Sequence, residues 1–238
     1  MRLHLLGVNG PYPQSNGANS GYLLEAGDAL FQFDFGAGVL ARLTALAPPE
    51  SLRAIFLSHW HFDHTSDLLP LIYRLQAEGK TLPVYAPVDE HSAIRRIVQE
   101  AGCFSLTDVT PGDRVELSGV TFTVMPARHP VPAVGYRAEE NEIRFGYTGD
   151  TNTLPALAEA YRGCRLLLAD GLFPTAQWAE GKPHLSAALA AELAAAAGAE
   201  KLILTHLNPV YPPELLLQEA RARFPEAVLA EAGRIFEI

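Results

Sequence analysis

The sequence predicts an α/β protein in which two mixed β-sheets pack face to face, with helices on their outer sides. Segments with strand-like alternation and segments with helical periodicity follow one another in both halves of the 238-residue chain. Between residues 115 and 147, four strand segments come in succession, which is typical of an antiparallel group. No low-complexity linker or short repeat interrupts the chain, so we expect one domain over residues 1–238.

The first half is expected to contain five strands and three helices. The strands are predicted at residues 3–6, 22–25, 29–34, 54–57 and 82–86. The helices are predicted at residues 39–46, 66–78 and 89–99, the last with Asp89 as its N-cap. The segment 34–38, Asp-Phe-Gly-Ala-Gly, joins a strand to a helix without the spacing of a dinucleotide-binding loop, and we interpret it as a tight turn.

The second half continues the alternation of strands and helices. Its strands are predicted at residues 115–117, 121–125, 133–138, 143–147, 165–168 and 201–205, with two short ones around Val228 and Ile235. Its helices are predicted at residues 156–161, 186–197 and 213–223, the second of them capped by Ser186.

Composition excludes several classes of protein. An apolar content of 48% with 19% charged residues is that of an ordinary globular protein with a sizeable core. A net charge of −9 argues against extensive nucleic-acid binding, which rests on Lys and Arg neutralising phosphates. We expect no signal peptide and no membrane span, since the most apolar helix is mostly alanine and contains Glu192. The two separated cysteines, Cys103 and Cys164, favour isolated thiols in a reducing cytoplasm.

Residues 59–64 read HWHFDH and directly follow the apolar segment 54–57. Imidazole and carboxylate groups are costly to bury unless they are paired or bind a metal, and both are usual ligands of zinc and related divalent ions. His59 and His61, two positions apart on an extended segment, can point the same way. Asp63 and His64 lie where the chain turns toward a helix. The spacing therefore predicts a metal site in which one pair grips one ion and the other pair faces a second.

Other candidate ligands follow predicted strands later in the chain. His129 comes after 121–125, Asp150 after 143–147 and His206 after 201–205. Side chains at strand ends can converge on one edge of a sandwich, which is where a site would form.

These residues together resemble the metallo-β-lactamase superfamily: an H-x-H-x-D-H motif with three later ligands in the family's order. The resemblance spans nearly the whole chain and implies the αββα sandwich fold. It implies that one ion is held by His59, His61 and His129, that the other is held by Asp63, His64 and His206, and that Asp150 bridges them. The β-lactamases of the family usually have cysteine at the bridging position. Neither cysteine of this chain stands there, which argues against a β-lactamase.

The C-terminal half resembles the RNase Z branch of that superfamily. The similar segments are Tyr-Thr-Gly-Asp-Thr at 147–151, Leu-Leu-Ala-Asp-Gly-Leu-Phe at 167–173 and His-Leu-Ser at 184–186. The resemblance implies that His184, oriented by Asp170, protonates the leaving oxygen, although Asp170 stands where that branch has glutamate. As an alternative, His184 is an ordinary residue ahead of the helix capped by Ser186. The branch's basic transfer-RNA arm has no room in the interval of 150 − 129 = 21 residues.

These features predict a dinuclear metal-dependent hydrolase, a phosphodiesterase that uses a metal-bridging hydroxide on a small or short substrate. The expected cofactors are two divalent ions, Zn²⁺ or alternatively Mn²⁺ or Fe²⁺, and Asp63, His184 and Asp170 are the expected catalytic residues. Hydrolysis of a carboxylic ester, thioester or lactone is the first alternative. Processing of transfer-RNA 3′ ends and a non-catalytic metal scaffold are others. No membrane partner is expected, and a homodimer is compatible with the sequence.

Overall fold

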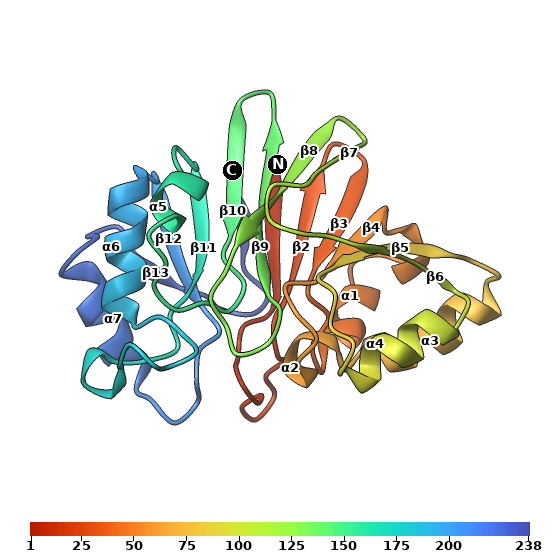
Figure 1. The fold of residues 1–238 in the computed structure, drawn as a ribbon, viewed down its shortest axis with the longest axis horizontal. Helices are drawn as coiled ribbons and strands as arrows, with labels where there is room; N and C mark the ends of the chain where they lie inside the picture. Colours follow the sequence, from red (N-terminus) through yellow and green to blue (C-terminus); the bar gives the residue numbers. More distant parts are fainter. The chain divides into compact units, whose positions relative to one another are not determined.

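The computed structural model describes residues 1–238, which form two compact units, each with one sheet of seven strands (Figure 1). Unit 1 comprises residues 1–109 and 231–237, and unit 2 comprises residues 110–230 and 238. Both sheets are mixed and both carry helices, as the α/β prediction requires.

Unit 1 contains the sheet ordered β14-β1-β2-β3-β4-β5-β6. Its strands are β1 (Arg2–Gly7), β2 (Gly21–Ala26), β3 (Ala29–Phe33), β4 (Ala54–Phe56), β5 (Leu82–Ala86), β6 (Phe104–Asp108) and β14 (Ile235–Glu237). The four strands from β14 to β3 pair antiparallel, whereas β3 to β6 pair parallel. Because parallel strands end at the same edge of a sheet, the residues after β3 and β4 are brought together.

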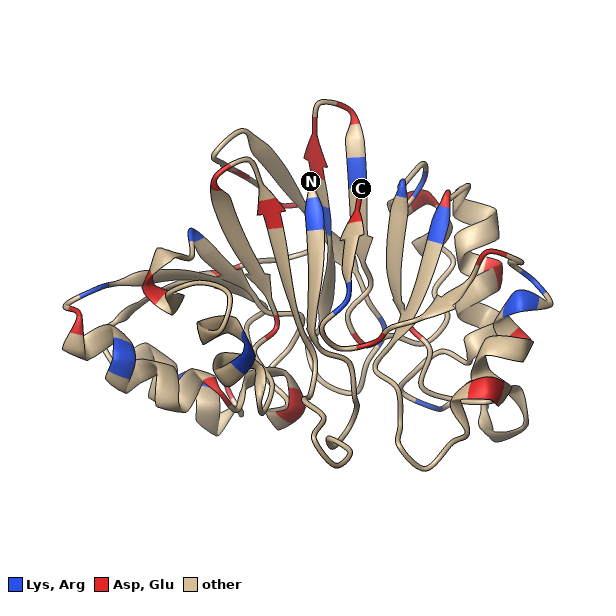
Figure 2. Cartoon of the chain, turned by 180° about the vertical axis from the view of Figure 1, so that it is seen from behind, with Lys and Arg blue, Asp and Glu red and all other residues tan.

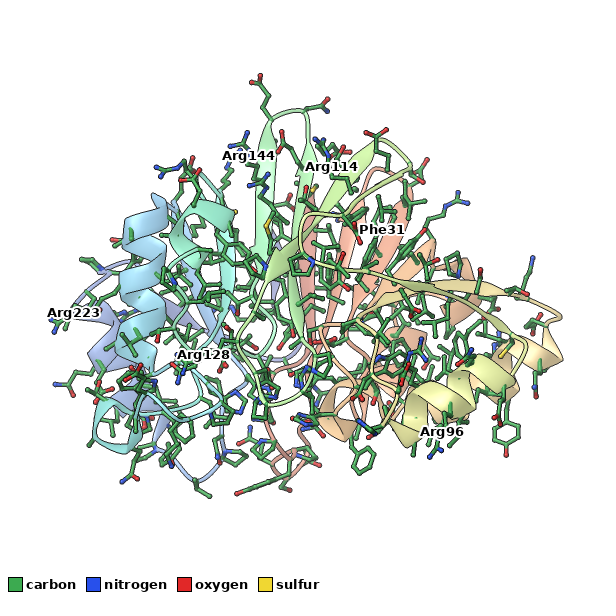
Figure 3. The ribbon with its side chains drawn as sticks, in the orientation of Figure 1. Phe31, Arg96, Arg114, Arg128, Arg144 and Arg223 are labelled. Atoms are coloured by element: carbon green, nitrogen blue, oxygen red, sulfur yellow. The ribbon has the colours of Figure 1, made fainter.

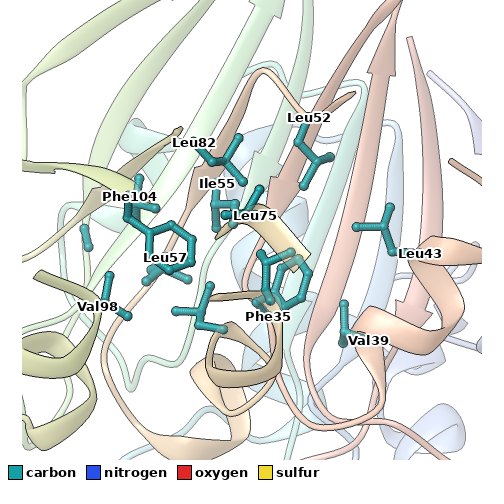
Figure 4. Packing of buried hydrophobic residues seen from close by; sticks show 14 of the residues in the cluster. Phe35, Val39, Leu43, Leu52, Ile55, Leu57, Leu75, Leu82, Val98 and Phe104 are labelled. Carbon is teal, nitrogen blue, oxygen red and sulfur yellow. The ribbon is translucent and has the colours of Figure 1, made fainter. Parts of the chain in front are cut away.

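The helices of unit 1 bury an apolar face against this sheet. They are α1 (Val39–Thr44), α2 (Phe62–Thr65), α3 (Leu68–Ala77), α4 (Ala93–Glu100) and a short 3₁₀ helix, η1 (Pro49–Ser51). Leu43, Leu75 and Val98, from three different helices, are fully buried in one cluster with Ile55 of β4 (Figure 4). Burial of each such side chain stabilises the fold by about 1.5–3 kcal/mol. This packing fixes the position of β4 and therefore of the loop that follows it.

Unit 2 contains the sheet ordered β13-β12-β11-β10-β9-β8-β7. Its strands are β7 (Arg114–Leu117), β8 (Val120–Pro126), β9 (Val134–Glu140), β10 (Ile143–Tyr147), β11 (Leu166–Asp170), β12 (Lys201–Thr205) and β13 (Val228–Leu229). The predicted antiparallel group is confirmed for β7 to β10, and β10 to β13 pair parallel. The ends of β10, β11 and β12 therefore lie along one edge.

The helices of unit 2 are α5 (Leu157–Ala160), α6 (Ala187–Ala197), α7 (Pro213–Arg221) and the 3₁₀ helix η2 (Thr175–Gln177). Helix α6 packs against β11 and β12, and its buried face is mostly alanine, which permits a close approach (Figure 1). Ser186 caps α6 as predicted, its side chain accepting the amide hydrogen of Leu189 at 3.2 Å. This cap fixes where the chain enters α6.

Three details of the predicted elements in unit 1 were wrong. Strand β6 was not predicted, because it is a partly exposed edge strand with little apolar alternation. Helix α2 is separate from α3. Ser92 rather than Asp89 caps α4, since its side chain accepts from Arg95, whereas Asp89 accepts from the amide of His91 and closes a turn.

Figure 2 shows Lys and Arg spread singly over strands, helices and loops, with Asp and Glu among them. No helix is both long enough and apolar enough to span a bilayer.

Both cysteines are buried and unbridged, and burial raises the pKa of the Cys164 thiol to about 12.

Candidate metal centre

The HWHFDH segment brings its four candidate ligands together at the end of β4. His59 is fully buried, and its Nε2 lies 2.9 Å from Nδ1 of His61, so two imidazole nitrogens converge. His61 is the N-cap residue of α2, which places Asp63 and His64 in the first turn of that helix. His64 Nε2 lies 3.6 Å from Asp63 Oδ2. The two pairs expected from the spacing are both present within unit 1.

Asp34, which the sequence analysis did not identify, supports this group. It follows β3, is fully buried, and one carboxylate oxygen lies 2.8 Å from His64 Nδ1. The amide and hydroxyl of Ser58 also donate to this carboxylate, at 2.7 and 2.8 Å. A carboxylate on one ring nitrogen fixes the tautomer and leaves the other nitrogen to face a metal. The sequence feature that could have identified Asp34 is a carboxylate at the end of a buried strand, just before a turn with glycine.

The turn after β3 requires glycine at position 36 because the chain passes very close to it. A Cβ at this position would lie 2.1 Å from the carbonyl oxygen of Asp63 and 2.6 Å from Cβ of Asn19. The turn therefore packs its backbone directly against the HWHFDH segment. The amide of Val39 donates to the carbonyl oxygen of Gly36 at 3.1 Å, which closes the turn that the sequence predicted.

The candidates in unit 2 come from separate strand ends. Asp150 follows β10 and His206 follows β12; both are buried, and His206 Nε2 lies 3.3 Å from Asp150 Oδ2. His206 has a φ of 56°, a left-handed conformation that costs energy for a residue other than glycine. Such strain persists where surrounding structure imposes it, and it is concentrated at functional sites.

His184 and Asp170 form a buried pair beside Asp150. His184 Nδ1 lies 2.9 Å from Asp170 Oδ2 and 3.8 Å from Asp150 Oδ2. The same Asp170 oxygen accepts from the amide of Thr151 at 3.1 Å, and the other oxygen accepts from the amide of Leu172 at 3.2 Å. Burial raises the pKa of Asp170, and the neighbouring His184 opposes that rise. Asp170 therefore orients the His184 ring.

His129 is the last of the candidates, and its position near His184 allows two roles for His184. Nδ1 of His129 lies 3.2 Å from the carbonyl oxygen of Pro183, which directs the other ring nitrogen away from that loop. His129, Asp150 and His184 each offer a ligand atom within 4.8 Å of the others. His184 is thus placed either as a ligand or as a proton donor next to one.

The donor set fits divalent metal ions. Within each unit, imidazole nitrogens and carboxylate oxygens converge. Burial of His59, His64, Asp150 and His206 would be costly without such a partner. All of the donors are nitrogen or oxygen, which suits zinc, manganese or iron(II).

Comparison with known proteins agrees with this chemistry. A family model described as "Beta-lactamase superfamily domain" matches residues 26–207. The "Probable metallo-hydrolase YhfI" of Bacillus subtilis (strain 168) is 29% identical over the full length of both chains. The "Ribonuclease Z" of Methanopyrus kandleri is 28% identical over 99% of this chain and 97% of its own.

Solved structures show the same fold. The crystal structure of YhfI matches with a TM-score of 0.93 and 28% identity over 99% of this chain and 98% of its own. That of the short form of human tRNase Z matches with a TM-score of 0.83 and 20% identity, over 100% and 99%. The metallo-β-lactamase fold prediction is confirmed. The interval between His129 and Asp150 holds only the β9–β10 hairpin, so no transfer-RNA arm is present there.

Proposed function

We propose that this chain, which belongs to the Beta-lactamase superfamily domain family, is a phosphodiesterase. At the coarser level it is a metal-dependent hydrolase with the metallo-β-lactamase fold. The observation that carries the finer proposal is the buried His184 imidazole 2.9 Å from Asp170, because an alkoxide leaves phosphorus poorly unless it is protonated. The similarity to a ribonuclease Z over nearly the whole chain supports the same bond class.

We take residues 1–238 to form one domain, because the family model spans the boundary after Val109. The proposed ligands are His59, His61 and His129 for one ion, Asp63, His64 and His206 for the other, and Asp150 as the bridge. Asp63 is proposed as a catalytic residue as well as a ligand. The two unbridged, buried thiols support a reducing, cytoplasmic setting.

When bound, two divalent ions would lower the pKa of a water to about 7 and offset charge on the phosphoryl oxygens. The attacking water gives up one proton to solvent, and its oxygen bonds to phosphorus while the bond to the departing oxygen breaks and that oxygen keeps the electron pair. His184 donates a proton from Nε2 to it, while Nδ1 stays on Asp170. The carboxylate of Asp170 holds the imidazole in place.

Substrate class is tested by a comparative assay. The protein, reconstituted separately with Zn²⁺, Mn²⁺ and Fe²⁺, is given bis-p-nitrophenyl phosphate, p-nitrophenyl acetate and a simple lactone. We expect the phosphodiester to have the highest kcat/KM with at least one metal. Faster turnover of the acetate or the lactone with every metal would overturn the proposal.

The role of His184 is tested with His184→Ala. As a proton donor, its loss lowers kcat by roughly 10²–10⁴-fold for a dinucleoside monophosphate, whose leaving group is an alkoxide. The loss is smaller for bis-p-nitrophenyl phosphate, because p-nitrophenolate needs no proton. Elemental analysis separates the alternatives: a proton donor leaves the metal content unchanged, whereas a ligand would take an ion with it.

A further inference from the structure

The loop just before His184 is organised around one buried side chain from another part of unit 2. Asn152 is fully buried, two residues beyond Asp150. Its Nδ2 donates toward three carbonyl oxygens of the loop 178–183: those of Ala179 at 3.3 Å, Glu180 at 3.1 Å and Lys182 at 2.6 Å. Its Oδ1 accepts from the indole nitrogen of Trp178 at 3.1 Å. The carboxamide therefore spans the loop from end to end.

The other contacts of the loop are made by backbone groups or surface side chains: the amide of Lys182 donates to the carbonyl oxygen of Ala179 at 3.0 Å, and the Lys182 ammonium lies 5.3 Å from the centroid of the Phe173 ring. The loop follows η2, forms no helix or strand, and Glu180 and Gly181 are exposed. Arg128, labelled in Figure 3, adds a contact of 3.4 Å between its guanidinium and the carbonyl oxygen of Glu180. The hydrogen bonds of the buried Asn152 amide stabilise the loop more than surface contacts do, because losing them leaves buried polar groups unsatisfied.

Both ends of this network reach the proposed chemistry. Pro183, the last residue of the loop, is bonded to His184, and its carbonyl oxygen faces Nδ1 of His129 at 3.2 Å. At the other end, the amide of Thr151, the neighbour of Asn152, donates to the Asp170 oxygen that holds His184. The Asn152 side chain thus ties the loop that leads into His184 to the segment that holds Asp170.

We propose that Asn152 is a positioning residue that fixes His184 on Asp170 by ordering the loop 178–183. This inference rests on the proposed function, in which His184 protonates the leaving oxygen. Proton transfer requires the donor within hydrogen-bond reach, and a displacement of about 1 Å costs as much as 10²-fold in rate. The Asn152 carboxamide contacts the loop, Trp178 and the amide of Thr153 rather than His184 itself, so its effect on proton transfer is exerted through the position of His184.

The test uses the full-length, metal-loaded protein with Asn152→Ala and Asn152→Asp. Both should lose about 10- to 10²-fold in kcat on a dinucleoside monophosphate and clearly less on bis-p-nitrophenyl phosphate. Asn152→Asp should be no better than alanine, because a carboxylate cannot donate to the three carbonyls. In the double variant with His184→Ala, Asn152→Ala should add no further leaving-group dependence. Asn19→Ala is the control: it removes another buried carboxamide and should affect both substrates equally.

A second readout does not depend on turnover. Hydrogen exchange measured by mass spectrometry should be faster over residues 178–184 in both Asn152 variants, and unchanged in β10 and β11. If Asn152→Ala does not fold, Trp178→Phe, which removes one donor to Asn152, should show a smaller effect in the same direction.

Equal losses on the two substrates, or unchanged exchange over 178–184, would overturn the inference while leaving the proposed function intact. Absence of leaving-group dependence in His184→Ala itself would instead refute the proposed proton donor.

Discussion

The two groups of candidate ligands are built in opposite ways. In unit 1 the four candidates lie within six consecutive positions, and their geometry comes from one loop and one helical turn. In unit 2 they are spread from His129 to His206 and follow different strands. There the spacing depends on the parallel register of β10, β11 and β12, in which Tyr147 pairs with Leu168 and Leu168 with Ile203.

This difference indicates how each group fails. A contiguous motif keeps its spacing unless its immediate support moves, and that support is a few atoms of Asp34, Ser58 and Gly36. The dispersed group of unit 2 keeps its spacing only while the register of the sheet is kept. Its members, however, also contact one another. Substitutions in unit 2 should therefore act first on chemistry, and those around the unit 1 motif first on metal affinity and stability.

The largest effect is expected for Asp150→Ala. Asp150 lies 3.3 Å from His206 and 3.8 Å from His184, and it is the proposed bridge. Turnover should fall by more than about 10³-fold, beyond the loss of one oxyanion-hole donor. Elemental analysis should show fewer than the roughly two ions per chain expected of a two-metal site. A variant that keeps both ions and near-normal activity would show that the bridge is assigned to the wrong residue.

Asp34→Asn tests the support of the unit 1 motif. Loss of the charge facing His64 Nδ1 should weaken metal binding by about 10–100-fold, as is usual for partners of metal-bound histidine. Competition with a chromogenic chelator measures this affinity. Asp67→Asn is the matched control, since Asp67 accepts from the amide of Leu40 at 2.8 Å and should not alter affinity. Equal affinities for the two variants would exclude this role for Asp34.

Gly36→Ala should act on stability. The added Cβ would meet the Asp63 carbonyl at 2.1 Å, so the turn or the motif must move, at about 1–3 kcal/mol of unfolding free energy. Gly181→Ala provides the comparison in unit 2, because a Cβ there meets no atom within 4 Å. Urea denaturation of both variants gives the difference. If Gly36→Ala unfolds at the wild-type midpoint, the close approach is absent in solution.

The smallest effect concerns pH. Burial raises the pKa of Asp67 above its ordinary 3.8, despite opposing backbone hydrogen bonds from Leu40, Gly38 and Val39. A raised carboxyl pKa favours the folded state below about pH 3.8, and this contribution is lost as the pH rises through the folded-state pKa. The stability of the wild type relative to Asp67→Asn should therefore fall as pH rises. A difference that stays constant or grows with pH would contradict the shift.

Much of the fold and part of the site were predictable because they depend on local sequence. Apolar periodicity placed most strands and helices, and Ser186 marked the start of α6 because its cap bonds only three residues ahead. The HWHFDH candidates could be identified from the sequence since they share one short segment. His129, Asp150 and His206 needed the family's order as well, because strand ends alone do not say which strands become neighbours.

The tertiary structure decided what depends on segments far apart in the chain. Asp34 faces His64 only because β3 and β4 pair in parallel, and Gly36 is required only because its turn meets the Asp63 carbonyl. Asn152 reads as an ordinary loop residue until the loop 178–183 folds over it. Sequence periodicity reports how each segment meets its immediate neighbours. A hydrogen bond between distant residues depends on sheet order and register, which no single segment specifies.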